Sequence, residues 1–156
     1  MHLPSALAAF TLLATTNAEF WVVKSVLGTM APGPVNPENG NWQWIMPANI
    51  RDCESAKHAS LYNQRSDVSG DKRGVRVKFA EESSLFEQLK PLEVEWNTWN
   101  DRHETWYQNR GGVYVNTDDH VQGSCVEDFS VNDECDLPAF GKMSFQSMLR
   151  CEGDAP

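Results

Sequence analysis

The chain has 156 residues, of which 40% are hydrophobic and 22% are charged, and its formal net charge at pH 7 is −9. This length suits one compact domain with its own hydrophobic core. The negative charge repels phosphate backbones and anionic membrane surfaces at long range, which disfavours nucleic-acid and membrane-surface binding.

The N-terminus predicts an export signal over residues 1–18. An apolar run from Leu3 to Ala14 is followed by a short polar stretch, and the small residues Thr16 and Ala18 suit signal peptidase. The run is too short to span a bilayer, and no later segment reaches the ~20 apolar residues that spanning requires. We therefore expect one secreted domain over residues 19–156.

All four cysteines lie in the expected secreted part: Cys53, Cys125, Cys135 and Cys151. An even number of cysteines in an oxidising compartment indicates two disulfides. Three pairings are possible. We expect Cys125–Cys135 as a local bond and Cys53–Cys151 as the bond that ties the end of the chain to its first half. Zinc is the rival interpretation, but no pair has C-x-x-C spacing, so we expect no metal.

The first half predicts two strands and one helix. Residues 19–27 are apolar at successive positions and rich in β-branched and aromatic side chains, which favours a strand buried on both faces. The proline-rich stretch 28–41 predicts a loop, and the alternation of Trp42, Trp44 and Met46 predicts a second strand.

A helix is expected next, capped by Asn49 or Asp52. Its apolar residues recur at helical spacing: Ile50, Cys53, Ala56 and Leu61. Residues 62–73 are polar and predict a surface loop. The pair Lys72-Arg73 within it is either a protease processing site or, as we favour, part of a solvated turn.

Two alternating segments predict neighbouring strands. In residues 74–80 and 92–96, apolar residues point to one face, and the other face carries Arg76 and Lys78 in the first segment and Glu93 and Glu95 in the second. Opposite charges on facing positions favour antiparallel pairing, with residues 81–91 as the connection.

The second half predicts a hairpin and further strands. Residues 105–107 and 113–115 flank a glycine-containing loop at 109–112, and a turn at 116–120 precedes a short strand at 121–125. Met143, Phe145 and Ser147 could line one face of a closing strand. Together these elements predict an α+β fold that is mainly antiparallel β: a small sandwich or half-barrel with one helix packed on the sheet.

Catalytic candidates are few. His103 lies in a charged segment that predicts a solvated turn, and no serine-nucleophile motif occurs. Asp118, Asp119 and His120 could hold a divalent ion, but adjacent residues on a turn rarely point at one centre. We expect neither a metal nor a cofactor.

Four residues nevertheless follow a known order: His58, Glu95, Arg110 and His120, with the glutamate in a Glu-Trp pair on a strand. In this respect the chain resembles the small secreted guanyl-specific ribonucleases of fungi. The resemblance implies RNA phosphodiester cleavage with Glu95 as general base, His120 as general acid and Arg110 steadying the phosphate.

The six tryptophans suggest a third class, the carbohydrate-binding modules, because an exposed indole can stack on a sugar ring. Strand positions assign most of these side chains to the core. Trp99, beside Asn97 and Asn100, is the candidate for ligand binding.

The overall layout carries a broader resemblance. Its features are the export signal, the first strand EFWVV, a helix-borne Cys53, a GVR strand, the G-x-C at 123–125 and a closing Arg-Cys-Glu at 150–152. This layout is similar to that of the small secreted, cysteine-containing proteins of filamentous fungi. The resemblance implies an effector-like, non-enzymatic protein. We expect a monomer that binds a host or competitor protein or glycan.

Overall fold

The computed structural model describes residues 18–27, 42–48, 52–80, 90–98, 102–137 and 141–153. The expected export signal, apart from Ala18, and the candidate Trp99 lie outside these ranges. The elements are β1 (Ala18–Leu27), β2 (Trp42–Ala48), α1 (Cys53–Lys57), β3 (Leu61–Asn63), β4 (Gly74–Phe79), β5 (Pro91–Asn97), β6 (His103–Tyr107), the 3-10 helix η1 (Gln108–Arg110), β7 (Val113–Asn116), β8 (Val121–Glu127), β9 (Asn132–Leu137) and β10 (Gly141–Gly153).

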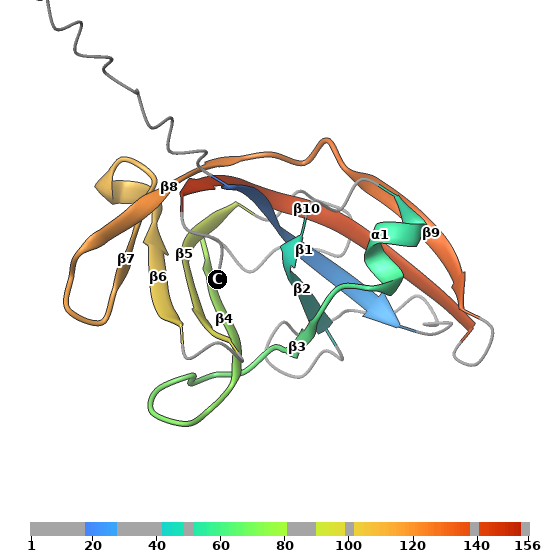
Figure 1. Ribbon diagram of the computed structural model, residues 1–156, viewed down its shortest axis with the longest axis horizontal. Helices are drawn as coiled ribbons and strands as arrows, with labels where there is room; N and C mark the ends of the chain where they lie inside the picture. The colour runs from blue at the N-terminus through green and yellow to red at the C-terminus, as the bar shows by residue number, and fades with distance from the viewer. Residues whose placement is uncertain are drawn as a thin grey trace, which may run out of the picture.

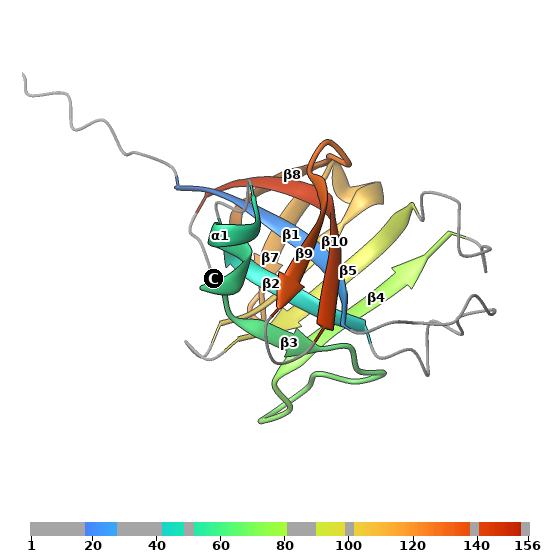
Figure 2. The same ribbon diagram turned by 90° about the vertical axis from the view of Figure 1, so that its right-hand side faces the viewer.

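The strands form one antiparallel sheet in the order β3-β2-β1-β10-β8-β7-β6-β5-β4, and β9 pairs with a further part of β10. The sheet curls into a half-barrel (Figures 1 and 2). Its two ends meet at a single parallel bridge between Gln64 and Val75. At this seam a Cβ on Gly74 would lie 2.7 Å from the carbonyl oxygen of Asn63, so only glycine fits. The predicted fold class is confirmed.

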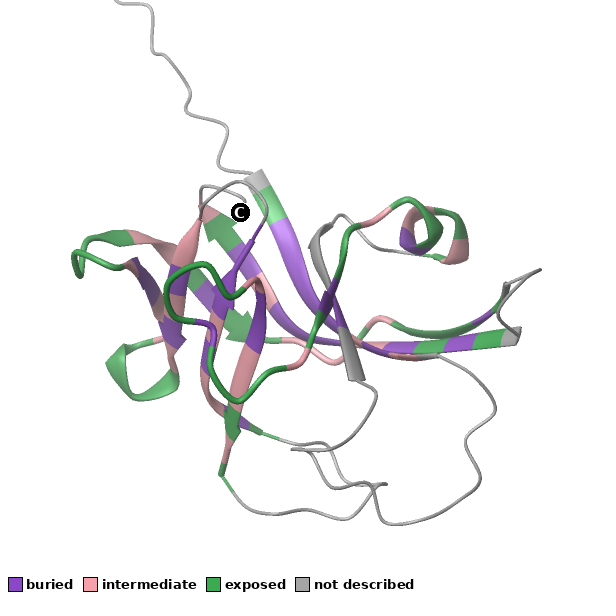
Figure 3. Ribbon diagram, turned by 90° about the horizontal axis from the view of Figure 1, so that it is seen from below, coloured by how far each residue is buried: buried purple, intermediate pink, exposed green. Residues whose placement is uncertain are grey.

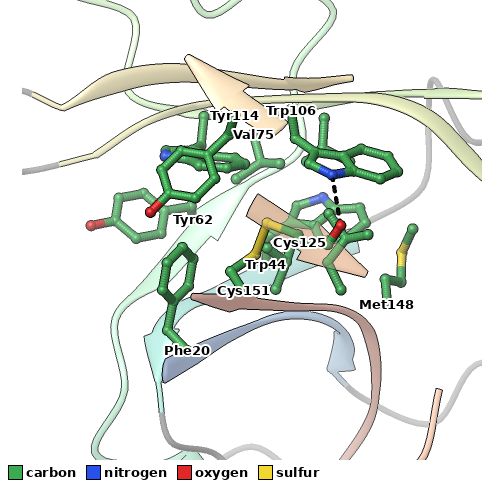
Figure 4. Packing of buried hydrophobic residues seen from close by; sticks show 13 residues of the cluster. Phe20, Trp44, Tyr62, Val75, Trp106, Tyr114, Cys125, Met148 and Cys151 are labelled. Carbon is green, nitrogen blue, oxygen red and sulfur yellow. Dashed lines mark hydrogen bonds between the residues drawn. A yellow bond between two sulfur atoms is a disulfide. The ribbon is translucent and has the colours of Figure 1, made fainter. Parts of the chain in front are cut away.

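The inside of the curl is filled by large side chains, which we call the inner cluster (Figure 4). Its buried members are Phe20, Val22, Trp44, Tyr62, Val75, Val94, Trp96, Trp106, Tyr114, Cys125, Met148, Leu149 and Cys151. Aromatic rings make much of this packing: Phe20 meets Trp96 and Tyr114 edge-on, with centroids 6.4 and 6.0 Å apart. The predicted core positions of Trp44 and Trp96 are confirmed.

The buried indoles also have hydrogen-bond partners. Trp96 Nε1 donates to Glu104 Oε2 at 2.8 Å, and Trp106 Nε1 donates to the Gly112 carbonyl at 2.9 Å. A second acceptor for Trp106 is the Cys125 carbonyl at 3.3 Å (Figure 4). Because an unpaired buried N–H is costly, these contacts fix where each indole can lie.

The outside of β1 and β10 carries a second cluster, the outer cluster. It consists of Trp21, Val23, Ala56, Cys135, Met143 and Phe145, with Cys53, Ala59 and Val131 packed against it. Helix α1 and strand β9 contribute to it from outside the curled sheet. Strand β1 is therefore buried on both faces, as predicted, and Figure 3 shows buried positions running along it.

A bulge in β10 lets that strand contribute buried side chains to both clusters. Val22 pairs with Leu149 but Val23 pairs with Ser147, so Met148 is an extra residue between the two pairs. Before the bulge, the odd-numbered residues Met143 and Phe145 face the outer cluster. After the bulge, the odd-numbered residues Leu149 and Cys151 face the inner cluster, because the extra residue shifts the alternation of the strand. The predicted burial of Met143, Phe145 and Ser147 in a closing strand is confirmed.

Helix α1 is shorter than predicted. Asp52 caps it in a capping box with Ser55, and it ends at Lys57. Its predicted extension to Leu61 is wrong, because Leu61 begins β3 and pairs with Ile45 of β2. Two strands were not predicted, β3 and β9. Leu61 of β3 was assigned to the helix and the rest of that strand to the polar loop, and polar residues dominate the sequence of β9.

Both disulfides form, but the expected pairing is wrong. The bonds are Cys53–Cys135, which links α1 to β9, and Cys125–Cys151, which links β8 to β10. Cys125 and Cys151 are directly opposite one another in the strand register, with their Cα atoms 4.0 Å apart. Because Cys151 is bonded to Cys125 and Cys135 is bonded to Cys53, neither expected bond forms.

Candidate functional site

The outer face of strands β4, β5 and β6 carries the largest ionic group among the described residues. The register places Arg76 opposite Glu95, and Lys78 opposite Glu93. The predicted antiparallel pairing of these strands, with basic residues facing acidic ones, is therefore confirmed.

Arg76 holds both glutamates. Its Nε donates to Glu95 Oε2 at 2.6 Å, and its Nη2 donates to Glu93 Oε1. Partial burial acts to lower the pKa of Arg76, but the two carboxylates outweigh it and raise the pKa. The guanidinium is thus a permanent charge that holds the two carboxylates of β5 in place.

His103 completes this group, and the expectation that it lies in a solvated turn is wrong. It is the first residue of β6, and its Nε2 lies 2.7 Å from Glu95 Oε1. We call Arg76, Glu93, Glu95 and His103 the charged cluster. Strand β6 begins two residues before the predicted strand 105–107, which is why the sequence pattern missed this histidine.

A hollow of about 450 Å³ lies beside the charged cluster, at the end of the strands. Its lining comes from β4, β5, β6 and η1: Lys78, Leu92, Glu93, Tyr107, Gln108, Asn109 and Arg110. Leu92 belongs to the inward-facing series of β5, whereas Glu93 faces outward. The hollow therefore sits on the rim of the half-barrel, and we call it the rim hollow.

Arg110 forms one wall of the rim hollow. Its Nη1 and Nη2 donate to the two carboxylate oxygens of Asp119 at 2.8 and 3.3 Å. The hydrogen bonds from Arg110 hold the pKa of Asp119 below its usual value. The guanidinium also lies over the Tyr107 ring, 5.2 Å from its centroid. These contacts fix its position from two sides.

The structure does not bring the four ribonuclease-like residues together as one set. Glu95 contacts Arg76 and His103, whereas Arg110 is bound to Asp119. His120 lies in the exposed turn between β7 and β8, and its backbone N–H donates to Asn116. His58 is the C-cap residue of helix α1, which Figure 1 shows on the side of the molecule away from η1.

The segment around Lys72-Arg73 is held by specific contacts. Arg73 Nη1 donates to Asn97 Oδ1 at 2.6 Å and also to the Thr98 carbonyl. Asn97 is itself buried and donates to the carbonyls of Val68 and Gly70. Proteolysis after Arg73 would have to break this network, which supports the interpretation as a turn.

Within the described ranges of the chain, no group of three His, Cys, Asp or Glu side chains gathers in a way that could hold a metal ion. No helix in those ranges is long and apolar enough to cross a membrane. The two disulfides are compatible with a secreted protein.

Comparisons with known proteins returned no match: no family model, no curated protein and no solved structure is similar to this chain.

Proposed function

We propose that this protein is a secreted, effector-like binding protein that acts on a host or competitor through its outer surface. The supporting observation is the filling of the half-barrel. Trp44, Trp96 and Trp106 occupy its interior with almost no exposed surface. A partner would therefore bind to the outer surface of the half-barrel, where the charged cluster and the rim hollow are adjacent.

The rigidity of this surface also supports the proposal. Strands β4, β5 and β6 are paired with one another, and Arg76 joins two of them by ion pairs. A partner that binds a preformed surface loses less conformational entropy than one that must order a loop. The bond Cys125–Cys151 would stabilise the sheet that carries this surface outside the cell, where thiols oxidise.

Export and biological role can be tested separately. Mass spectrometry of the culture fluid should find the chain without residues 1–18, and non-reducing peptide mapping should find Cys53–Cys135 and Cys125–Cys151. Transcript levels should rise during colonisation, and deletion should weaken colonisation or competition. Constitutive expression without a deletion phenotype would contradict the proposal.

Cleavage of RNA is the second candidate function, and the grouping of Glu95, His103 and Arg76 favours it. A carboxylate and an imidazole at 2.7 Å could transfer protons, and a guanidinium could stabilise a phosphate. This set differs from the one that the sequence suggested, since His103 takes the place of the more distant histidines. The net charge of −9 opposes it, because an acidic surface repels RNA.

An assay on yeast RNA decides between the two functions. Cleavage above a buffer blank that is lost in Glu95→Gln and His103→Gln, but kept in His58→Gln, would establish the ribonuclease. The absence of cleavage by the purified, oxidised protein would remove it.

A further inference from the structure

We propose that the rim hollow is a saccharide-binding site that holds a short oligosaccharide through the side chains of β4, β5, β6 and η1. This inference rests on the proposed function, because it names the chemical class of the partner. It also moves the expected sugar site away from Trp99, to residues that the sequence analysis did not connect with carbohydrate.

The mixture of hydrogen-bonding groups is the first argument. Lys78 can only donate, the ionised Glu93 can only accept, and the amides of Gln108 and Asn109 do both. A simple anion would meet the Glu93 carboxylate, and an apolar ligand would leave the side chains of Lys78, Gln108 and Asn109 without partners. Each sugar hydroxyl both donates and accepts, so closely spaced hydroxyls can satisfy the whole set.

The second argument is that this capacity is unused. Within the described residues, the side chains of Lys78, Gln108 and Asn109 have no hydrogen-bond partner. By contrast, Arg110 at the same rim is tied to Asp119. The hollow thus combines groups that are available to a ligand with one that is already held in place.

Apolar contact for the C–H faces of a sugar comes from Leu92 and from the ring of Tyr107. The Tyr107 ring is oriented by Arg110, 5.2 Å from its centroid. Such orientation before binding lowers the entropy lost when a ligand arrives. The volume of about 450 Å³ also falls within the range of about 300–1,000 Å³ that is usual for small-ligand sites.

A peptide is the competing ligand, and the strand pairing disfavours it. Extended peptides gain affinity by hydrogen bonding to an unpaired strand edge. Strand β5 pairs with β4 on one side and β6 on the other, so its backbone groups are already used. Recognition along β5 must therefore come from side chains, which suits a ligand rich in hydroxyls. The last strand of the sheet order, β4, contributes Lys78 to the hollow and is bridged to the other end of the sheet at Val75.

The test uses the protein purified from culture fluid with both disulfides intact. Its binding is measured on an array of glucan, chitin, xylan, mannan and galactan oligosaccharides, and then by calorimetry with the best hexamer. We expect at least one class to bind, and we expect the double variant Gln108→Ala/Asn109→Ala to weaken binding at least tenfold. Both residues are exposed, so the fold should be unaffected; circular dichroism checks this.

The matched control is Asn132→Ala, an exposed amide on β9 outside the hollow, which should bind like the unaltered protein. The inference is overturned if no oligosaccharide binds, if the double variant binds normally, or if only peptides from a displayed library compete for the hollow.

The outcome is also distinguishable from that of the proposed function. Oligosaccharide binding without any deletion phenotype would leave the sugar site standing and remove the effector role. A deletion phenotype that the double variant fully restores would keep the effector role and overturn the saccharide site.

Discussion

The inner and outer clusters share strands β1 and β10 but are enclosed in different ways. The inner cluster is surrounded by paired strands, and its bond Cys125–Cys151 joins residues that are already opposite each other. The outer cluster is covered by the five-residue α1 and by the edge strand β9, which Cys53–Cys135 ties together. One disulfide reinforces strand pairing, whereas the other replaces packing that a longer helix would provide.

Replacing an indole of the inner cluster should have the largest effect. Trp106→Ala removes a fully buried ring and withdraws the indole N–H from the carbonyls of Gly112 and Cys125, so we expect a loss of about 3–5 kcal/mol in the free energy of unfolding. Urea unfolding followed by circular dichroism measures it. The control Val126→Ala, on an exposed side chain, should change stability by less than about 0.5 kcal/mol. A loss below about 1 kcal/mol for Trp106→Ala would contradict the role of the inner cluster.

Removing the outer disulfide tests the difference directly. For Cys53→Ser/Cys135→Ser, loop-closure entropy across a sequence separation of 82 predicts a loss of up to about 4.5 kcal/mol, and about 2–4 kcal/mol is typical. Hydrogen exchange should accelerate in α1 and β9 while β4 to β7 stay protected.

The comparison variant, Cys125→Ala/Cys151→Ala, removes the bond that closes the shorter span, with a sequence separation of 26. This variant should lose protection from hydrogen exchange throughout the sheet. If both variants gave the same exchange pattern, the two disulfides would have the same role and the comparison would fail.

The pKa of Lys24 tests how far water reaches the edge of the inner cluster at β1. It is half-buried beside Trp44, its partner in the strand register, and burial lowers its pKa from 10.5 to about 8. Between pH 8 and 10.5 the unfolded chain keeps the proton that the folded protein has released, so stability should rise with pH in that window.

The rise should be at most about 3.5 kcal/mol, at about 1.4 kcal/mol per pKa unit. Lys24→Met should remove it and raise stability at pH 7, as measured by urea unfolding across the pH range. The exposed Lys57→Met is the control and should leave the pH dependence unchanged. A flat profile in the unaltered protein would show that Lys24 is well hydrated.

The smallest effect is expected from Trp96→Phe. The variant keeps an aromatic ring but withdraws the indole N–H from the buried Glu104, whose Oε1 still receives Arg102 Nη1 at 3.3 Å. We expect a loss of about 1–2 kcal/mol. Trp96→Phe combined with Glu104→Gln should recover part of it in urea unfolding, since the remaining buried group is then neutral. Equal losses in the single and double variants would mean that the indole acts through packing alone.

Much of the fold could be predicted because its strands alternate. Arg76 and Glu95 face each other as expected, since a period of two puts charges on one face and Val75 and Trp96 on the other. Strands β3 and β9 were missed because only Tyr62 and Cys135, among the residues whose burial is described, are buried in them. One buried position in a short strand is too little to reveal an alternating pattern.

The candidate site was harder to predict than the fold. The contact between His103 and Glu95 depends on where β6 begins, which a one-sequence pattern cannot locate to the residue. The disulfide pairing depends on strand register and on the bulge at Met148, and cysteine spacing contains neither. The sequence order of His58, Glu95, Arg110 and His120 likewise says nothing of which strands become neighbours.

The bulge in β10 has a consequence for how the protein is made. Among the described residues, β10 is the last strand and completes both clusters, and it pairs along much of its length with β1, the first. Neither hydrophobic interior can close before β10 has been synthesised and has left the ribosome. Contacts between such distant segments also make folding slow, which gives the cysteines time to find their partners.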